Sequence, residues 1–273
     1  MENNYQTPPK VLSIAGFDGS CGAGLQADLK TFSALHCYGL TVLTSLPIQN
    51  TKGVQKIYEI PPYIIEKQLN CMFEDVIPSA IKIGMLFNTE IIKIVAEFLE
   101  KNAKGIPIVL DPVMVAKSGD NLLLPEAISS IKEYLIPQAT VITPNLPEAS
   151  VLLNKEINTI KEMELAGKIL LQMGAGAILL KGGHLENENS NDFYTDNKNN
   201  SLWLNSKRIA TSNTHGTGCT ISAAIASYIS LGNDSLTACK NAKTYVFHAL
   251  KKADILKMGQ GNGALHHFYD LWK

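Results

Sequence analysis

The chain has 273 residues, of which 45% are hydrophobic and 18% charged, so it can bury a substantial core and is not a disordered protein. Its formal net charge of −1 argues against a surface for polyanions, and we therefore expect no nucleic-acid partner. The start lacks the features of a signal peptide, no apolar run is long enough to cross a membrane, and the five cysteines form no Cys-x-x-Cys motif. We expect a cytoplasmic protein with free thiols and no membrane partner.

Short apolar runs alternate with amphipathic helical patterns along the chain. Buried strands separated by such helices predict an α/β fold, with a mostly parallel sheet covered by helices on both faces. Since no linker interrupts the pattern, we expect residues 1–273 to form one domain. The predicted strands are residues 11–15, 41–46, 80–83, 106–110, 140–142 and 177–180, and the helical faces include one carried by Leu165, Ile169 and Met173.

The last third of the chain departs from this alternation. Residues 192–195 and 201–204 flank a polar turn, which predicts an antiparallel hairpin at one edge of the sheet. Two further helices are predicted after Cys219. Glycine-rich or polar loops follow four of the predicted parallel strands, and such loops meet at the carboxyl edge of a sheet, where ligands bind. These loops are residues 16–24, 111–119, 143–148 and 181–184.

The first loop contains GAGLQA at residues 22–27, which matches the G-x-G-x-x-A form of a dinucleotide-binding fingerprint. That fingerprint also needs an acidic residue about 20 positions later. Residues 29–58 contain no Asp or Glu. We therefore expect the glycines to let the backbone approach a different ligand.

Two polar side chains near this loop have the chemistry to bind a heteroaromatic ring. Asp28 follows the first loop and Gln49 ends the second β-like segment, while Asp18 lies within the loop itself. A carboxylate and a carboxamide together supply acceptors and donors for ring nitrogens and an amino group. The alternative for Asp28 is a solvated carboxylate in the first turn of a helix, favoured there by the helix dipole.

Residues 214–219 read Thr-His-Gly-Thr-Gly-Cys and lead into the small apolar residues 220–226, which predict a helix. Backbone N–H groups at a helix start are unpaired and favour an anion, and Cys219 places a thiol beside them. Donors aimed at one point beside a proton acceptor suit phosphoryl transfer to a hydroxyl. Alternatively, Gly216 and Gly218 only make a tight turn.

Polar residues with phosphate and metal chemistry follow three more predicted strands. Asp111 and the Asn145-x-x-Glu148 segment supply oxygen ligands of the kind that hold Mg²⁺ through its waters. Lys181 offers a cation that can neutralise phosphate charge. Glu148 could equally be a first-turn helix residue.

Seven motifs in this order resemble those of the hydroxymethylpyrimidine/phosphomethylpyrimidine kinases of thiamine biosynthesis, in the ribokinase-like superfamily. The resemblance covers nearly the whole chain, and the combination is highly specific although each motif alone is weak. The motifs are GAGLQADLKT (22–31), QNT (49–51), KIGML (82–86), DPVM (111–114), TPNLPEA (143–149), KGGH (181–184) and THGTGCT (214–220).

The resemblance implies a three-layer ribokinase-like fold that often forms a homodimer, with ATP and Mg²⁺ as cofactors. It implies that ATP phosphorylates 4-amino-5-hydroxymethyl-2-methylpyrimidine and that a second ATP extends the monophosphate to the diphosphate. Residues 113–124 look like the family's flap over the substrate. By the same resemblance, Asp28, Gln49 and Met85 contact the pyrimidine, Asp111, Asn145, Glu148 and Lys181 serve the triphosphate and Mg²⁺, and Gly216, Thr217, Gly218 and Cys219 form the anion hole with Cys219 as base.

Two other functions stay open from the sequence. Pyridoxal kinases share the reaction and the superfamily, although many of them carry Asp where this chain has Cys219. A catalytically silent ligand-binding module is the more remote alternative, and the phosphoryl-transfer residues argue against it. A helix start lowers the pKa of a thiol whereas ATP charges raise it, so Cys219 could be a base or only fill space. Cys21 stands where the family usually has glycine or another small residue.

Overall fold

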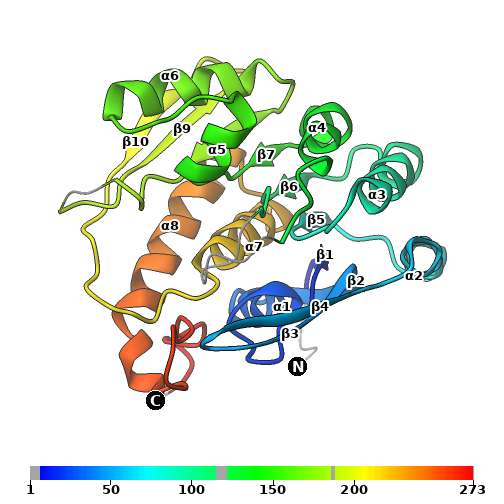
Figure 1. Cartoon of the computed structure of the whole chain (residues 1–273), viewed down its shortest axis with the longest axis horizontal. Coiled ribbons are helices and arrows are strands. Elements are labelled where there is room, and N and C mark those ends of the chain that lie inside the picture. The colour runs from blue at the N-terminus through cyan, green and yellow to red at the C-terminus, as the bar shows by residue number, and fades with distance from the viewer. Residues whose placement is uncertain (1–6, 115–121, 186–187, 273) are drawn as a thin grey trace, which may run out of the picture.

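A central sheet organises the computed structural model, which describes residues 7–114, 122–185 and 188–272. The eight strands that these residues contribute lie in the order β10-β9-β8-β7-β6-β5-β1-β2 (Figure 1). Every neighbouring pair from β8 to β2 is parallel, and β9 and β10 are antiparallel. The strands are β1 (Lys10–Ala15), β2 (Tyr38–Leu43), β5 (Ala80–Ile83), β6 (Ile108–Leu110), β7 (Val141–Ile142), β8 (Ala177–Leu180), β9 (Asp192–Asp196) and β10 (Ser201–Leu204).

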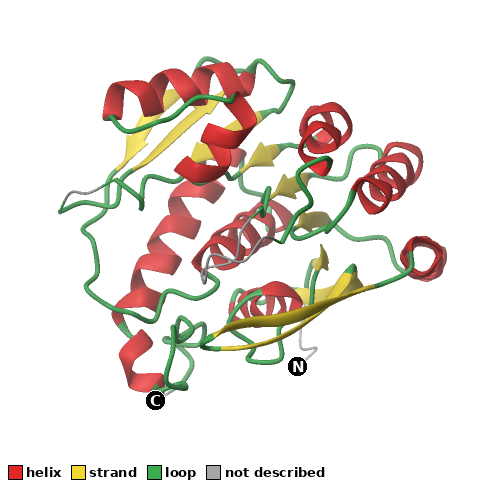
Figure 2. Ribbon diagram, viewed as in Figure 1, coloured by secondary structure: helices red, strands yellow, loops and turns green. Residues whose placement is uncertain are grey.

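Helices cover both faces of the sheet, so the predicted three-layer α/β fold is confirmed (Figure 2). Each layer packs on its own buried apolar cluster. One face carries α1 (Gly24–Ala34), α7 (Thr217–Ser230) and α8 (Ser235–Lys251). The other carries α2 (Pro62–Asp75), α3 (Thr89–Asn102), α4 (Ala127–Ser130), a π-helical turn (Ile131–Leu135), a 3₁₀ turn (Ile136–Gln138), α5 (Leu146–Leu153) and α6 (Ile160–Leu171). A 3₁₀ turn (Ala253–Leu256) follows α8.

The predicted strand at residues 41–46 has the wrong bounds: residues 41–43 belong to β2, and the chain leaves the central sheet at Thr44. The Thr44 N–H donates to the Ala15 carbonyl at 3.0 Å, and its hydroxyl donates to the Met85 carbonyl at 2.5 Å. Beyond this corner, β3 (Ser45–Asn50) pairs antiparallel with β4 (Gly53–Glu59) in a separate two-stranded sheet. The turn of this hairpin contacts the C-terminal segment, where the Asn262 N–H donates to the Thr51 carbonyl at 2.8 Å.

The predicted face of α6 is also wrong. Its buried residues are Met163, Ala166, Gly167 and Leu170, whereas Leu165 is 50% exposed. The Phe193 ring decides the orientation, since a Cβ added at Gly167 would lie 2.8 Å from a ring carbon. Small residues must therefore face β9. The hairpin that contains Phe193 is confirmed, because β9 pairs antiparallel with β10.

Parallel strands bring the functional loops to one edge of the sheet. β1, β5, β6, β7 and β8 all end there, so the loops at residues 16–24, 143–148 and 181–184 share one rim. Of the predicted loop 111–119 and flap 113–124, residues 115–121 lie outside the described residues. Among the residues that the structure describes, no helix is long and apolar enough to cross a membrane.

A buried ion pair joins α8 to β9 beside this rim and yields a stability prediction. Lys243 Nζ lies 2.6 Å from Asp192 Oδ2, and the Gly182 N–H donates to Asp192 Oδ1 at 3.0 Å. Asp192→Ala should lower the free energy of unfolding by about 3 kcal/mol, because it leaves a nearly buried ammonium unpaired. Glu164→Ala breaks an exposed pair with Lys168 and should cost below about 1 kcal/mol. Denaturant titration measures both, and equal losses would contradict the assignment.

Candidate active site

The start of α7 packs backbone to backbone against the first loop. Gly216, the N-cap of α7, has φ +77°, a left-handed conformation that favours glycine. A Cβ added there would overlap the carbonyl oxygen of Gly22. Glycine at position 216 is thus required by two independent constraints, and the predicted anion-binding turn is held directly against the loop at residues 16–24.

The turn at residues 216–219 lies over an ion pair at the ends of β6 and β8. A Cβ added at Gly218 would lie 3.2 Å from Lys181 Nζ and 3.4 Å from Asp111 Oδ2. The Thr217 N–H already donates to the Thr214 carbonyl at 3.3 Å. The predicted contacts to an anion therefore fall to the backbone N–H groups of Gly218 and Cys219.

Asp111 and Lys181, which the sequence predicts separately as a metal ligand and a phosphate-binding cation, form an ion pair. Lys181 Nζ lies 2.9 Å from Asp111 Oδ1, and the Thr143 hydroxyl donates to the same oxygen at 3.1 Å. Burial alone would lower the pKa of Lys181, but the negative charges of Asp111 and Glu148 outweigh burial and raise it. Lys181 is accordingly a cation at neutral pH, held beside the N-terminus of α7.

Asn145 and Glu148 form a capping box at the start of α5. The Asn145 side chain accepts from the Glu148 N–H at 2.8 Å, and Glu148 Oε2 accepts from the Asn145 N–H at 2.7 Å. The first-turn alternative for Glu148 is therefore confirmed. Burial raises the pKa of Glu148 to about 7, although the charge of Lys181 opposes this shift. Glu148 lies close enough to Lys181 and Asp111 to sense their charges. Its role as a metal ligand stays a prediction.

Cys219 is the third residue of α7, and its side chain is partly buried. Cys219 belongs to the turn that packs against the first loop. Burial raises the pKa of the Cys219 thiol to about 11, and the positive charge of Lys82 only partly offsets this. Burial thus outweighs the helix terminus, and the thiol is protonated at neutral pH.

Met85 and Gln49 meet the first loop at its other end. A Cβ added at Gly16 would lie 3.2 Å from the sulfur of Met85, and Gln49 Nε2 lies 3.5 Å from the Phe17 carbonyl. The register of the hairpin shifts here, because Ile48 pairs with Lys56 and Gln49 with Val54. The structure therefore places two of the three predicted pyrimidine contacts around Gly16 and Phe17, while contact with the ring itself stays a prediction.

Asp28 is enclosed rather than open to a ligand. It lies within α1 with no exposed surface, and its Oδ2 accepts from the Ser13 hydroxyl at 2.5 Å and from Lys82 at 2.8 Å. The alternative of a solvated first-turn carboxylate is wrong, because the helix turns this residue toward the sheet. A direct contact between Asp28 and the pyrimidine stays a prediction that this geometry does not support.

Asp18, His215 and Lys82 belong to the site, although no sequence pattern assigned a role to them. Asp18 binds His215 Nε2 at 2.8 Å, and although burial raises the pKa of Asp18, hydrogen bonds from His215 and Ser20 lower it to about 2. Lys82 interrupts an otherwise apolar strand, which was the available sign of its role. The backbone at Cys21 has φ +58°, the conformation in which the family's usual glycine is most comfortable.

The residues present fit Mg²⁺ that is shared with phosphates. Among the described residues, no group of three or more His, Cys, Asp or Glu side chains could hold a metal ion. Mg²⁺ commonly keeps several waters and uses only one or two carboxylates together with substrate phosphates. Asp111 and Glu148, which sense each other's charge beside Lys181, satisfy that requirement.

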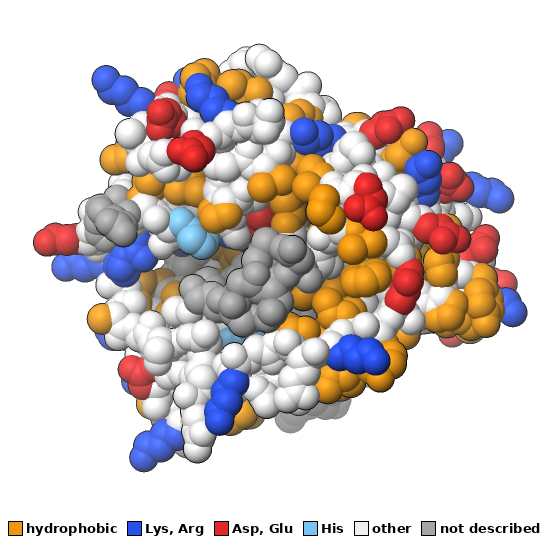
Figure 3. Space-filling view, in the orientation of Figure 1, with side chains coloured by type: hydrophobic (Ala, Val, Ile, Leu, Met, Phe, Trp, Pro, Cys, Tyr) orange, Lys and Arg blue, Asp and Glu red, His pale blue; other side chains and the backbone are white. Residues whose placement is uncertain are grey.

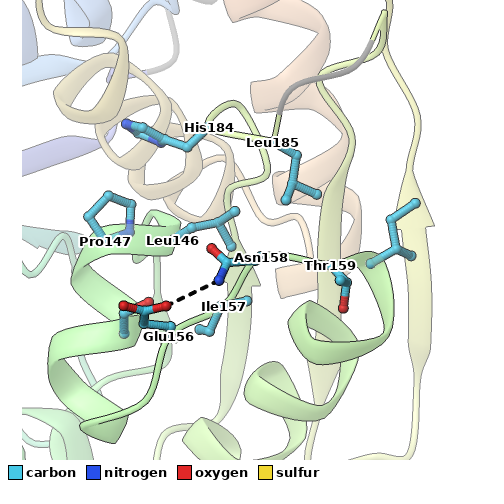
Figure 4. A pocket seen from close by; sticks show the side chains of 10 residues that line it. Leu146, Pro147, Glu156, Ile157, Asn158, Thr159, His184 and Leu185 are labelled. Atoms are coloured by element: carbon cyan, nitrogen blue, oxygen red, sulfur yellow. Dashed lines mark hydrogen bonds between the residues drawn. The ribbon is translucent and has the colours of Figure 1, made fainter.

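A cavity opens on the α5–α6 side of this rim. Its volume is about 730 Å³, and the Glu156 carboxylate accepts from the Asn158 side chain in its wall (Figure 4). Leu146 and His184 connect its lining to the segments that carry Glu148 and Lys181. Figure 3 shows that charged side chains lie mainly around the periphery of the same face, while a hollow near its centre is bordered by a histidine.

The model of the phosphomethylpyrimidine kinase family matches residues 18–266. The chain belongs to this family. The hydroxymethylpyrimidine/phosphomethylpyrimidine kinase of Escherichia coli is 47% identical over 263 residues, which cover 96% of this chain and 98% of that protein.

Solved structures extend this likeness from the family to the fold. A phosphomethylpyrimidine kinase of Clostridium difficile is 42% identical, with a TM-score of 0.78, and the match covers 89% of this chain and 100% of that one. The pyridoxal kinase of Staphylococcus aureus, in complex with AMP-PCP and pyridoxal, is 35% identical with a TM-score of 0.87 over 97% and 96% of the two chains. The ribokinase-like architecture of this phosphomethylpyrimidine kinase family member is confirmed.

The raised pKa of Glu148 predicts how stability depends on pH. The folded protein binds the Glu148 proton more tightly than the unfolded chain, so the stabilisation is complete below about pH 4.5 and lost as pH rises through 7. Glu148→Gln keeps the capping box and does not titrate. The unfolding free energy of wild type relative to this variant should fall by up to about 3 kcal/mol between pH 4.5 and 8. A difference that is constant or grows with pH would show an ionised Glu148 throughout.

Proposed function

We propose that this protein uses ATP to phosphorylate the hydroxymethyl group of 4-amino-5-hydroxymethyl-2-methylpyrimidine, and then extends the monophosphate to the diphosphate in thiamine biosynthesis. Membership of the phosphomethylpyrimidine kinase family supports this substrate class. The structural observation that carries the proposal is the position of Gly218 against the Lys181–Asp111 pair. Paired N–H groups beside a buried cation are suited to the charge that develops on a transferred phosphoryl group.

The ATP phosphates would lie between the α7 N-terminus and the ends of β6, β7 and β8. Lys181 binds and neutralises phosphate oxygens, while Asn145 holds the α5 cap that presents Glu148. Asp111 and Glu148 would hold Mg²⁺ through its waters, and the ion would supply further neutralisation of phosphate charge. The N–H groups of Gly218 and Cys219 orient the group to be transferred.

Cys219 is proposed to receive the proton of the substrate hydroxyl. With a pKa of about 11, only on the order of 10⁻⁴–10⁻³ of the thiol is ionised at pH 7–8. A base so rarely ionised makes the first phosphorylation strongly dependent on pH. The second step has no such need, because its acceptor is a phosphate that is already anionic.

Pyridoxal phosphorylation is the second candidate. The pyridoxal kinase of Staphylococcus aureus shares the whole fold, and its complex contains pyridoxal itself. The higher identity of the Escherichia coli kinase, 47% against 35%, favours the pyrimidine. Steady-state rates with both rings and ATP decide between them, and a kcat/KM at least tenfold higher for pyridoxal would overturn the pyrimidine assignment.

We also propose that residues 1–273 act as one cytoplasmic kinase domain within a homodimer. The family resemblance supports dimerisation, and the free state of all five cysteines is compatible with a reducing compartment. Light scattering at several protein concentrations tests the oligomeric state, and a mass of about 30 kDa, that of one chain, at every concentration would refute the dimer.

Removing the Cys219 thiol should separate the two half-reactions. Cys219→Ala should lower kcat of the first phosphorylation by roughly 10²–10⁴-fold with KM within a few-fold, and leave the second step much less affected. The wild-type first step should also accelerate as pH rises towards the Cys219 pKa of about 11, and the variant should lose that slope. An equal loss in both steps would indicate a positional role, and no loss in either would refute the base.

Replacing Gln49 should weaken binding of the ring selectively. Its carboxamide can pair with the amino group and adjacent nitrogen of the pyrimidine, and losing this pairing should cost about 1–3 kcal/mol. Gln49→Ala should therefore raise KM for the pyrimidine much more than KM for ATP. Gln68→Ala is a control, because Gln68 hydrogen-bonds the backbone of Leu43 outside the proposed ring site. Equal effects of Gln49→Ala on both KM values would remove Gln49 from the pocket.

A further inference from the structure

Lys82 lies on β5, inside the sheet, on the face that α7 and its anion-binding turn (residues 216–219) cover. Strand register sets Ser13, Lys82 and Val109 side by side on β1, β5 and β6. Two residues further along, the same face carries Ala15, Gly84 and Asp111 at the carboxyl edge. Hydrogen bonds continue the ladder to this row, with the Gly84 N–H donating to Ile14 and the Asp111 N–H to Ile83, both at 2.9 Å.

Gly84 leaves space at the edge of the sheet, and the Lys82 ammonium occupies it. A Cβ added at Gly84 would lie 2.8 Å from Lys82 Nζ and 3.2 Å from the Ala15 Cβ. The ammonium therefore occupies the space that a side chain at position 84 would take, in the same row as Asp111. Helix α7 packs over these strands, which sets its first turn above the charge.

Stability alone does not account for this ion pair. Lys82 and Asp28 have no exposed surface, and their 2.8 Å contact is reinforced by the Ser13 hydroxyl. Among the described residues, Asp28 Oδ1 is buried with no hydrogen-bond partner. Burying two charges costs more than their attraction returns unless every polar atom is satisfied, and apolar replacements are often neutral or stabilising. An incompletely satisfied pair is therefore better explained by function.

The charge of Lys82 is permanent over the working pH range. Burial alone would lower its pKa, but the negative charges of Asp28 and Asp111 outweigh burial and hold the pKa above its ordinary value. A fixed cation in a water-poor environment costs no reorganisation when negative charge develops near it. Lys82 thus adds to the field that the α7 N-terminus and Lys181 create, from the opposite side of the turn.

We propose that Lys82 is a positioning residue for phosphoryl transfer: held by Asp28 and Ser13 in the gap left by Gly84, it is a buried positive charge whose field acts on Asp111 and on the anion-binding turn that carries Cys219. This proposal rests on the kinase function proposed above. It assigns to the buried strand residue an electrostatic role, with no contact to either substrate.

Lys82→Met tests the charge while keeping most of the side-chain volume. In the full-length protein, we expect kcat to fall at least about tenfold in both phosphorylation steps, with KM for ATP and for the ring within about threefold. Lys168→Met removes the ammonium of the exposed pair with Glu164 and should keep the wild-type kcat. Wild-type kcat in folded Lys82→Met, or a change confined to KM, would overturn the proposal.

Gly84→Ala is a second test that keeps both charges, and it decides the matter if Lys82→Met does not fold. The added methyl must displace the ammonium, so kcat should fall several-fold while circular dichroism shows a folded protein; an unchanged kcat would overturn the proposal. Wild type is assayed with the pyrimidine and with pyridoxal. If wild type does not phosphorylate the pyrimidine, the proposed substrate is refuted but the role of Lys82 is not. The variants are then compared on whichever ring wild type phosphorylates.

Discussion

The contact between the Gly22 carbonyl and residue 216 is the constraint on which the site depends. Any side chain at position 216 would overlap that oxygen. The first loop (residues 16–24) and the start of α7 can therefore pack this closely only because residue 216 is glycine. Asp18 reinforces the contact through His215, whose Nε2 lies 2.8 Å from Asp18 Oδ2. A displacement of either segment must therefore move the other, which would couple the proposed ring binding to the proposed phosphoryl transfer.

Absent side chains serve a second purpose at this rim, because they let charge approach charge. Gly218 leaves room for the Lys181–Asp111 pair beneath the turn, and Gly84 leaves room for the Lys82 ammonium. Both cations are paired with carboxylates, so the protein holds them without excess charge. Fixed and pre-oriented charge is what favours a phosphoryl-transfer transition state over its hydrated ground state.

The protonation states divide the site between fixed and titrating groups. Lys82 and Lys181 stay cationic and Asp18 stays anionic near neutral pH, whereas Glu148 titrates near 7 and Cys219 near 11. The fixed charges build the architecture of the site. The titrating groups are those to which metal binding and proton transfer are assigned, so both functions respond to pH while the framework does not.

The sequence by itself determined the layered fold and the loops that meet at one rim, because each depends on local periodicity and on glycine placement. Apolar runs, helical spacing and the turn before residues 201–204 are properties of neighbouring residues. The helix at residues 220–226 and the antiparallel hairpin were predictable for the same reason, although α7 begins at Thr217, three residues before that stretch. The family resemblance added the reaction, since seven motifs in order are more specific than any pattern of burial.

Only the tertiary structure decided features that depend on partners distant in sequence. The corner at Thr44 is set by Ala15 and Met85, and the buried face of α6 by the Phe193 ring. Lys82 meets an Asp 54 positions earlier, on a different element. No local pattern encodes such a pairing, because burial and electrostatic environment arise from which elements pack together and not from the residues beside them in the chain.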